Sequence, residues 1–219
     1  TRVLPEVTIS ELTPRKRRFF LKYLARFLLL FESVKAKGSF LDNKRVIVTA
    51  APHQSGKDEY LMILMILALD IDVCYLSAKW TMRRIPIPFI KPKDIDNQGI
   101  PWPLGWLQEI VFRKFGAIPV DRKGNSGQYD SVVQELYKRD SFLLIITPEG
   151  RFDSTRFRSS FLYLAKELEA EVMPVQIDYE HDTLQFLNSL NLDGSEEEVI
   201  QRLRSCFDGV KGRKSRFKA

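Results

Sequence analysis

The sequence predicts an α/β protein with a central, mostly parallel sheet flanked by helices. Apolar runs of strand length alternate with segments of helix length, and prolines and glycines stand between them. The chain has 219 residues, which is long enough for one sizeable core. Apolar residues make up 44% and charged residues 28%, a balance that is typical of globular proteins and excludes general disorder.

The first predicted element is an amphipathic helix that begins at Thr13 or Pro14 and ends near Val34. It starts with a basic cluster, residues 15–18, and continues with an apolar stripe at i, i+3/i+4 spacing. The stripe consists of Phe19, Phe20, Tyr23, Leu24, Phe27, Leu28 and Phe31. Basic residues beside a wide aromatic face are typical of a membrane-interface helix, whereas a helix packed on the domain's own core would carry a similar stripe. We therefore divide the chain into a membrane-associating segment, 1–40, and an α/β domain, 41–219.

The rest of the chain alternates strands and helices. The predicted strands are residues 46–50, 73–77, 117–120, 142–147, 172–177 and, with a weaker pattern, 183–187. The predicted helices are residues 58–69, 106–115, 126–139, 159–169 and 195–207. The last helix opens with the capping box Ser195-x-x-Glu198.

Residues 85–103 interrupt this alternation, because five of the eleven prolines fall there beside Phe89 and Trp102. Proline opposes regular structure and aromatic side chains resist full solvation, so we expect a lid or a lipid-contacting loop. Residues 211–218 are basic, and we expect a solvated tail.

The net charge of +6 suits an anionic partner such as a nucleic acid, an anionic lipid surface or a phosphorylated substrate. No nucleic-acid recognition module is recognisable, so we expect no nucleic-acid partner. Cys74 and Cys206 lack metal-ligand spacing, and we expect reduced, buried thiols and no metal site. No stretch reaches the ~18 consecutive apolar residues of a spanning helix, so we expect no membrane span.

His53 and Asp58 form the first segment with chemical potential. His53 directly follows a predicted buried strand, and Asp58 lies in the first turn of the helix after it. Imidazole can accept a proton from a hydroxyl near neutral pH, and a neighbouring carboxylate fixes its tautomer. A helix cap for Asp58 and a structural hydrogen bond for His53 are the alternatives, since Ser55-x-x-Asp58 also matches a capping box.

Three further segments follow strands or lie within them. Gly116-Ala117-Ile118-Pro119-Val120-Asp121-Arg122 ends in an arginine that can hold a phosphate, or that can simply pair with Asp121 in solvent. Thr147-Pro148-Glu149-Gly150-Arg151 follows a buried strand, where α/β proteins place their sites, although a plain turn is the alternative. Val172-Met173-Pro174-Val175 offers an apolar wall.

In this order the four segments, His-x4-Asp, Gly-x-Ile-Pro-Val-Asp-Arg, Pro-Glu-Gly-Arg and Val-x-Pro-Val, resemble the glycerolphosphate/1-acylglycerol-3-phosphate acyltransferase superfamily. The resemblance covers roughly residues 45 to 210 and includes Asp178-Tyr179 after the fourth segment. It implies an acyltransferase-like α/β fold and transfer of a fatty acyl group from acyl-CoA or acyl-carrier protein to a hydroxyl of a lysophospholipid-type acceptor, lysophosphatidic acid by default. No cofactor beyond this co-substrate is implied.

The resemblance assigns roles residue by residue. It implies catalytic roles for His53, as general base, and Asp58, which orients it. It implies acceptor binding by Gly116, Arg122, Glu149, Gly150 and Arg151. It also implies a peripheral position on the cytoplasmic face of a membrane.

The sequence departs from the family pattern in two places. Pro52 stands where the family usually has asparagine, and no threonine separates Gly150 from Arg151. Arg156 or Arg158 is therefore an alternative to Arg151 as the phosphate-binding arginine. A non-catalytic lipid-binding relative is the main alternative function, and a basic nucleic-acid-binding protein is a remoter one.

Overall fold

The apolar runs of the sequence form strands in the computed structural model, which describes residues 6–79, 82–85, 100–120, 127–149 and 156–213. The chain divides into two compact units. The first unit contains residues 1–72 and 140–219, and the second contains residues 73–139. The chain therefore leaves the first unit once, forms the second, and returns.

The first unit is built on a sheet with the strand order β1-β2-β10-β9-β3-β8. Its strands are β1 (Glu6–Thr8), β2 (Lys35–Ser39), β3 (Arg45–Ala51), β8 (Phe142–Ile146), β9 (Glu171–Asp178) and β10 (Thr183–Phe186). Neighbouring strands are parallel except for β9 and β10, which are antiparallel. The predicted α/β class with a mostly parallel sheet is confirmed.

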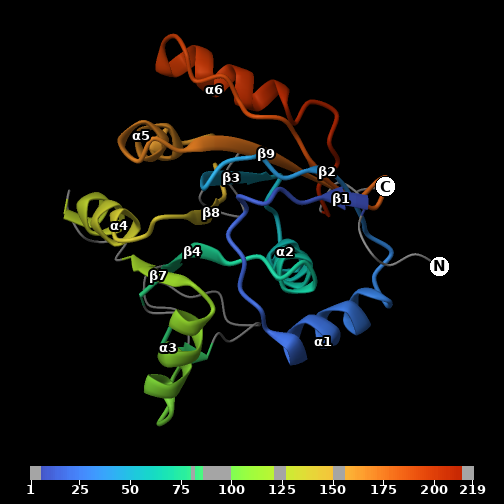
Figure 1. Ribbon diagram of the computed structural model, residues 1–219, viewed down its shortest axis with the longest axis vertical. Helices are drawn as coiled ribbons and strands as arrows, with labels where there is room; N and C mark the ends of the chain where they lie inside the picture. The colour runs from blue at the N-terminus through green and yellow to red at the C-terminus, as the bar shows by residue number, and fades with distance from the viewer. Residues whose placement is uncertain (1–5, 80–81, 86–99, 121–126, 150–155, 214–219) are drawn as a thin grey trace. The chain divides into compact units, whose positions relative to one another are not determined.

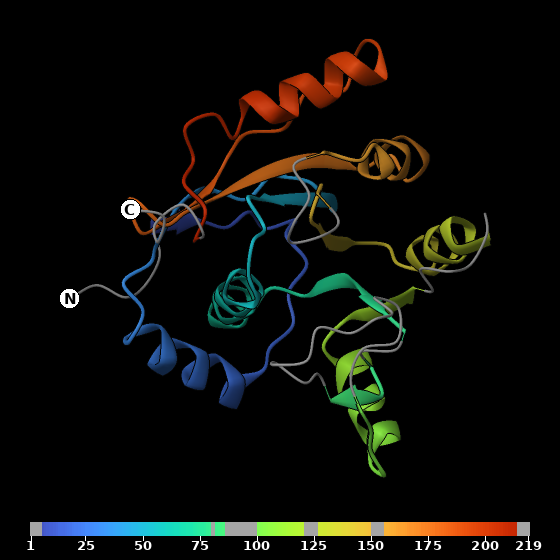
Figure 2. The same ribbon diagram turned by 180° about the vertical axis from the view of Figure 1, so that it is seen from behind.

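Helices cover both faces of this sheet. They are α1 (Phe19–Leu29), α2 (Gly56–Ala68), α5 (Ser160–Glu167) and α6 (Glu196–Ser205). In Figures 1 and 2 the sheet lies between α2 and α1 on one side and α5 and α6 on the other. The predicted capping box is present at the start of α6, where Ser195 and Glu198 bond each other's backbone N–H groups.

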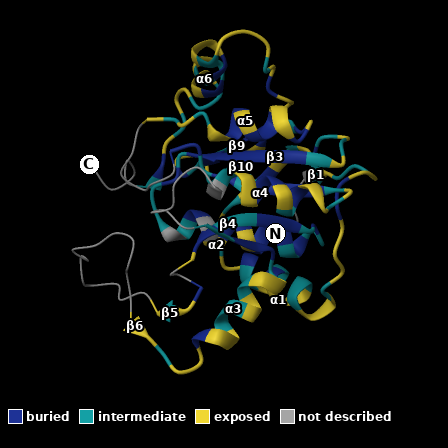
Figure 3. Ribbon diagram, turned by 90° about the vertical axis from the view of Figure 1, so that its left-hand side faces the viewer, coloured by how far each residue is buried: buried dark blue, intermediate teal, exposed yellow. Residues whose placement is uncertain are grey.

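The core of the first unit lies on the central strands. Ile47 of β3, Leu144 of β8 and Val172 of β9 are fully buried, and Figure 3 shows β3 and β9 coloured as buried. Phe161 of α5 is also fully buried. Strands covered on both faces need continuous apolar runs rather than alternation, which is the pattern the sequence has.

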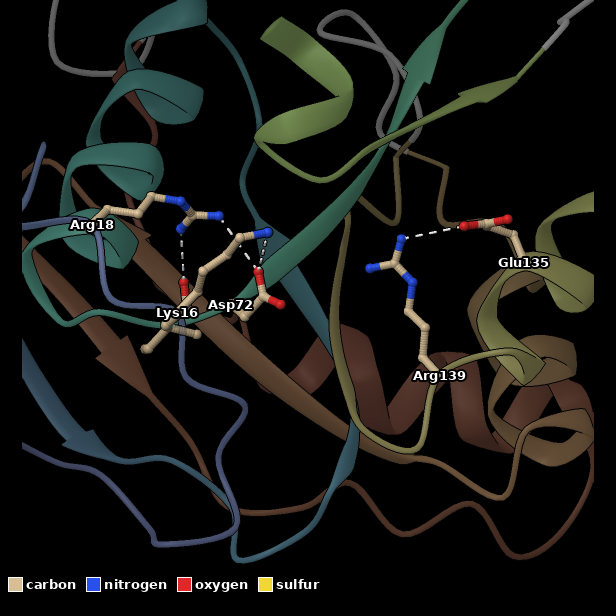
Figure 4. Close-up of polar contacts among 6 residues, drawn as sticks. Lys16, Arg18, Asp72, Glu135 and Arg139 are labelled. Atoms are coloured by element: carbon tan, nitrogen blue, oxygen red, sulfur yellow. Dashed lines mark hydrogen bonds and ion pairs between the residues drawn. The ribbon is translucent and has the colours of Figure 1, made fainter. Parts of the chain in front are cut away.

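Helix α1 is shorter than predicted at both ends. It ends at Leu29 rather than near Val34, and the segment before Phe19 is extended. The backbone N–H of Asp72 donates to the Pro14 carbonyl at 2.8 Å, and that of Lys16 donates to the Asp70 carbonyl at 2.9 Å. Figure 4 shows Lys16 and Arg18 converging on the Asp72 carboxylate, with nitrogen–oxygen distances of 3.6 Å and 3.4 Å. Part of the basic cluster therefore pairs with acidic residues of its own unit.

Strands β1 and β2 are absent from the prediction, and β2 shows why. Its sequence, Lys-Ala-Lys-Gly-Ser, has one buried residue, Ala36, and no apolar run. Gly38 has φ +108°, and a Cβ there would lie 2.2 Å from the Phe186 carbonyl oxygen. Glycine is required at this point because β2 and β10 approach closely.

The second unit contains a parallel strand pair and two helices. Its elements are β4 (Val73–Ala78), β7 (Ala117–Val120), α3 (Gly105–Lys114), α4 (Gly127–Tyr137) and the short hairpin strands β5 (Arg84–Ile85) and β6 (Ile100–Pro101). Just after α4, the Arg139 guanidinium forms an ion pair with the Glu135 carboxylate at 3.4 Å (Figure 4). Most of the proline-rich loop, residues 86–99, lies outside the described residues.

No helix among the described segments is long and apolar enough to cross a membrane. Cys74 and Cys206 are free thiols, as predicted, although Cys206 is only half-buried. Of the basic stretch 211–218, for which a solvated tail is predicted, residues 214–218 lie outside the described residues. The Lys211 carbonyl accepts a hydrogen bond from the backbone N–H of Tyr179 at 2.9 Å, so this residue contacts the first unit.

Candidate active site

Three neighbouring strands of the first unit deliver polar side chains to one edge of the sheet. Strand β3 lies between β8 and β9 and runs parallel to both. His53 follows the carboxyl end of β3, Glu149 follows β8 and Tyr179 follows β9. The carboxyl ends of parallel strands are where α/β folds place their sites, and here the sequence positions three chemically capable residues there.

His53 and Asp58 form a buried pair. Their side chains are 7% and 1% exposed, and His53 Nδ1 lies 3.6 Å from Asp58 Oδ2. This separation is longer than a hydrogen bond, so the contact is electrostatic in the structure. Nδ1 faces the carboxylate, which leaves Nε2 as the ring nitrogen on the side away from Asp58. The preceding Ala51–Pro52 peptide bond is cis.

Asp58 also caps helix α2, so the capping interpretation is confirmed. Its Oδ2 accepts hydrogen bonds of 2.7 Å from the backbone N–H groups of Gln54 and Ser55. Its Oδ1 accepts from the Ser55 hydroxyl at 3.2 Å and from the Tyr179 hydroxyl at 2.5 Å. One carboxylate thus fixes the loop that carries His53 and faces the imidazole as well.

Glu149 joins the pair from β8. Its Oε1 accepts a hydrogen bond of 3.1 Å from the backbone N–H of His53. The side chain is buried, and Oε2 has no hydrogen-bond partner among the described residues. A buried oxygen without a partner costs free energy, and this one lies beside a histidine in a candidate site.

The pKa values of the Asp58 and Glu149 carboxyls are shifted in opposite directions. Burial raises the pKa of Asp58, but the contacts with His53, the Tyr179 hydroxyl and two backbone N–H groups outweigh it, so the pKa lies below its usual value. Burial dominates at Glu149 and raises its pKa, assisted by the charge of Asp58. Pairs of groups with pKa values pushed apart are characteristic of acid–base sites.

Tyr179 is the functional candidate to which sequence reasoning gave no role. It is buried, and its pKa is raised by burial and by the hydrogen bond to Asp58. The sequence does place this tyrosine directly after a predicted strand, at the carboxyl end of the sheet. Its hydrogen-bond partner Asp58, however, lies 121 residues away in the sequence, so no local pattern predicts the contact.

The remaining predicted residues are only partly described. Gly116 lies in the second unit with φ +91°, where a Cβ would lie 1.9 Å from the Val73 carbonyl oxygen. This close approach explains the glycine without a ligand, and its predicted part in binding stays a prediction. Arg122, Gly150 and Arg151 lie outside the described residues.

Arg156 and Arg158, the alternatives to Arg151, are both exposed. The backbone N–H of Arg158 donates to the Pro148 carbonyl at 2.9 Å, which ties this segment to the turn that carries Glu149. Within the described part of the chain, no group of three or more His, Cys, Asp or Glu side chains could hold a metal ion.

Helix α1 presents a second surface of functional interest. Only Ala25 and Leu29 of the helix are buried, and α1 lies beside α2 (Figures 1 and 2). All residues of the predicted stripe except Leu28 are exposed, and with Leu30 they form a surface that we call the α1 aromatic face. It consists of Phe19, Phe20, Tyr23, Leu24, Phe27, Leu30 and Phe31, each 41–77% exposed. A contiguous exposed apolar face of this kind marks a contact surface.

No protein-family model matches this chain, and no curated protein sequence matches it.

Proposed function

We propose that this protein is an acyltransferase that moves a fatty acyl group from a thioester donor to a lipid hydroxyl. The observation that carries the proposal is the buried His53–Asp58 pair at the carboxyl end of a parallel sheet. The ordered resemblance to the glycerolphosphate/1-acylglycerol-3-phosphate acyltransferases supports the reaction type. The donor is acyl-CoA or acyl-carrier protein, and lysophosphatidic acid is the default acceptor.

In the proposed mechanism His53 is the general base. Nε2 takes the proton from the acceptor hydroxyl, and the hydroxyl oxygen attacks the thioester carbonyl carbon. The carbon–sulfur bond breaks, the thiolate leaves, and the proton held by the imidazolium passes to the sulfur. Asp58 stabilises the imidazolium through Nδ1, and its own charge is maintained by four hydrogen-bond donors.

Acceptor binding draws on the other motifs. In this proposal the buried Glu149, whose Oε2 has no hydrogen-bond partner among the described residues, accepts a hydrogen bond from an acceptor hydroxyl. Arg122 and Arg151, assigned from the resemblance, hold the acceptor phosphate, and Glu149 with Gly150 orders the acceptor pocket. Gly116 is assigned to acceptor binding by the same resemblance. Of these five residues, the structure describes only Glu149 and Gly116.

We also propose that the α1 aromatic face lies on an anionic lipid surface, at the cytoplasmic side of a membrane. Exposed phenylalanines lower their free energy by entering the acyl-chain boundary, and a net charge of +6 adds attraction to anionic headgroups. Arg15 and Arg17 at the start of this segment are exposed. This placement brings the enzyme to its lipid acceptor.

The test is thiol release from acyl-CoA in the presence of a lysolipid panel, with product identified by chromatography. We expect His53→Ala to lower the rate by roughly 10²–10⁴-fold, the usual contribution of a general base. His181→Ala is the matched control. It removes the second of two histidines, which is exposed and also contacts an aspartate, Asp178, at 2.7 Å.

The outcomes separate the hypotheses clearly. A wild-type rate that His53→Ala abolishes and His181→Ala leaves intact supports the mechanism. Retention of most activity in His53→Ala would sink it. Binding of lysolipid without thiol release by the wild type would favour the non-catalytic lipid-binding alternative.

A further inference from the structure

Tyr179 lies at the end of β9 and reaches the carboxylate that faces His53. The strand register explains how, since Ala51 of β3 is paired with Gln176 of β9. Tyr179 stands three residues beyond Gln176, just as Gln54 stands three residues beyond Ala51. The phenol is therefore brought level with the His53 loop, and its hydroxyl donates to Asp58 Oδ1 at 2.5 Å.

The two oxygens of Asp58 have separate sets of donors. Oδ2 accepts two backbone N–H groups and faces His53 Nδ1. Oδ1 accepts two hydroxyl groups, one from Ser55 within the same turn and one from Tyr179 across the sheet edge. The Tyr179 bond is the shorter of the two and is charge-assisted, and it ties the carboxylate to a separate strand. Rotation of the carboxylate about its Cβ–Cγ bond would break contacts at both oxygens.

We propose that Tyr179 is a positioning residue for the His53–Asp58 pair, holding the Asp58 carboxylate in the plane that faces the imidazole. The effect of Tyr179 on catalysis rests on the proposed function. Its effect on the orientation of the Asp58 carboxylate does not depend on that function. Tyr179 touches no reacting atom and acts through Asp58.

Tyr179 is itself held in place from a third direction. Its backbone N–H donates to the Lys211 carbonyl at 2.9 Å. The next residue, Gly212, is buried, and a Cβ there would lie 2.4 Å from Gln54 Oε1. Residues 211–212 therefore contact both Tyr179 and the loop of His53, which limits movement of the phenol relative to Asp58.

The titratable side chains around Asp58 set the expected direction of a pH effect. They are those of His53, Glu149 and Tyr179, and the positive charge of Arg213 lowers the pKa of the phenol somewhat. Without the phenol donor, the Asp58 carboxylate can rotate away from Nδ1, so it stabilises the protonated imidazole less. We therefore expect the acid limb of the kcat/KM profile to move to lower pH in Tyr179→Phe.

The test compares Tyr179→Phe with Tyr163→Phe. Tyr163 is a matched control, because its hydroxyl donates to a carboxylate, Glu196, at 2.5 Å on the exposed surface of α5. We expect Tyr179→Phe to lower kcat by roughly ten- to hundredfold, the range found when a group that orients a metal-binding side chain is removed. The acceptor KM should change little, and Tyr163→Phe should resemble the wild type.

A second measurement does not depend on activity. The chain has two histidines, so ¹⁵N spectra of the imidazoles can be assigned with His181→Ala. In the wild type we expect His53 to carry its proton on Nδ1, facing Asp58. In Tyr179→Phe we expect a mixed tautomer population, and thermal melting checks that the fold persists.

The outcomes decide the two proposals separately. Loss of kcat, a shifted acid limb and a changed tautomer population together support the positioning role. The role is overturned if Tyr179→Phe keeps the wild-type His53 tautomer and a kcat within about twofold, whatever the wild-type activity is. A wild type without acyl transfer overturns the proposed function, and the imidazole spectra still decide the role of Tyr179. If Tyr179→Phe lowers kcat further in an Asp58→Asn background, the effect does not pass through Asp58 and the role is again rejected.

Discussion

Replacement of Asp58 by asparagine tests how far one carboxylate stabilises both the fold and the site. The change keeps the shape of the side chain and removes its charge. Asp58 accepts four hydrogen bonds, from two backbone N–H groups and from the hydroxyls of Ser55 and Tyr179. The amide can keep its oxygen toward the backbone donors, while the two hydroxyls rotate to accept from its NH₂ group.

The expected loss follows from these contacts. A hydrogen bond to a charged group contributes about 1.5–3 kcal/mol and a neutral one about 0.5–1.5 kcal/mol, so four bonds lose roughly 4 kcal/mol in total. A neutral amide is also less costly to bury, and this offsets part of the loss. We expect a net destabilisation of about 2–3 kcal/mol, which lowers the melting temperature by roughly 5–10 °C in a domain of this size.

The effect should depend on pH in a defined direction. In the folded protein the pKa of Asp58 is below its usual value of 3.8. Between the folded and unfolded pKa values, the unfolded chain therefore binds more protons than the folded protein. The charged Asp58 carboxylate contributes its full stabilisation of the fold above the unfolded pKa, and this contribution is lost as the pH falls through the folded pKa. The difference between wild type and Asp58→Asn should therefore be constant near neutrality and shrink below pH 3.8.

Urea unfolding followed by circular dichroism from pH 3 to pH 7 measures this difference. Acyl transfer at pH 7 should also fall, by roughly 10³–10⁴-fold, because the imidazole loses its charged partner. Stability of Asp58→Asn equal to or above that of the wild type at neutral pH would refute the reasoning. Parallel pH curves for the two proteins would do so as well.

Two further predictions concern Glu149 and the α1 aromatic face. The pKa of Glu149 is raised above its usual value of 4.5, so its unfavourable contribution appears as the pH rises through the folded pKa. Glu149→Gln should therefore flatten the decline of the melting temperature with pH above 4.5, and an unchanged decline would contradict this. Phe19→Ser combined with Phe20→Ser should leave the melting temperature nearly unchanged, since both side chains are at least 75% exposed. Sedimentation with anionic vesicles should fall by more than about tenfold, because each buried phenylalanine contributes about 1.5–3 kcal/mol. Tyr137→Ser, at a side chain 50% exposed on α4, should bind vesicles like the wild type.

Much of the fold follows from local sequence patterns. The strands that build the centre of the sheet, β3, β8 and β9, were predicted to within a residue or two, because each is a continuous apolar run with clear boundaries. Strand β2 was missed because a strand with one buried residue has no apolar pattern to detect, although it lies between β1 and β10. The early start predicted for α1 was wrong because residues 14–16 pair with residues 70–72, a contact that no local pattern records.

The candidate site divides in the same way. His53 and Asp58 are five residues apart, and their proximity follows from a strand exit and a helix start. The approach of Glu149 to His53 depended on the order of strands in the sheet. Tyr179 depended on the register of β9 against β3, which a single sequence does not specify.

The discontinuous first unit has a consequence for the order in which the protein folds. The His53–Glu149 and Asp58–Tyr179 contacts join residues 96 and 121 positions apart, and residues 73–139 lie between the partners. Contacts of such long range form slowly, because a large loop must close before they contribute. During synthesis from the N-terminus, helix α2 and its capped loop can form early, whereas the phenol and its Lys211 anchor arrive last. A nascent chain stalled before residue 179 therefore holds His53 and Asp58 without the phenol that we propose to orient the carboxylate. We expect the complete site to appear only with the finished fold.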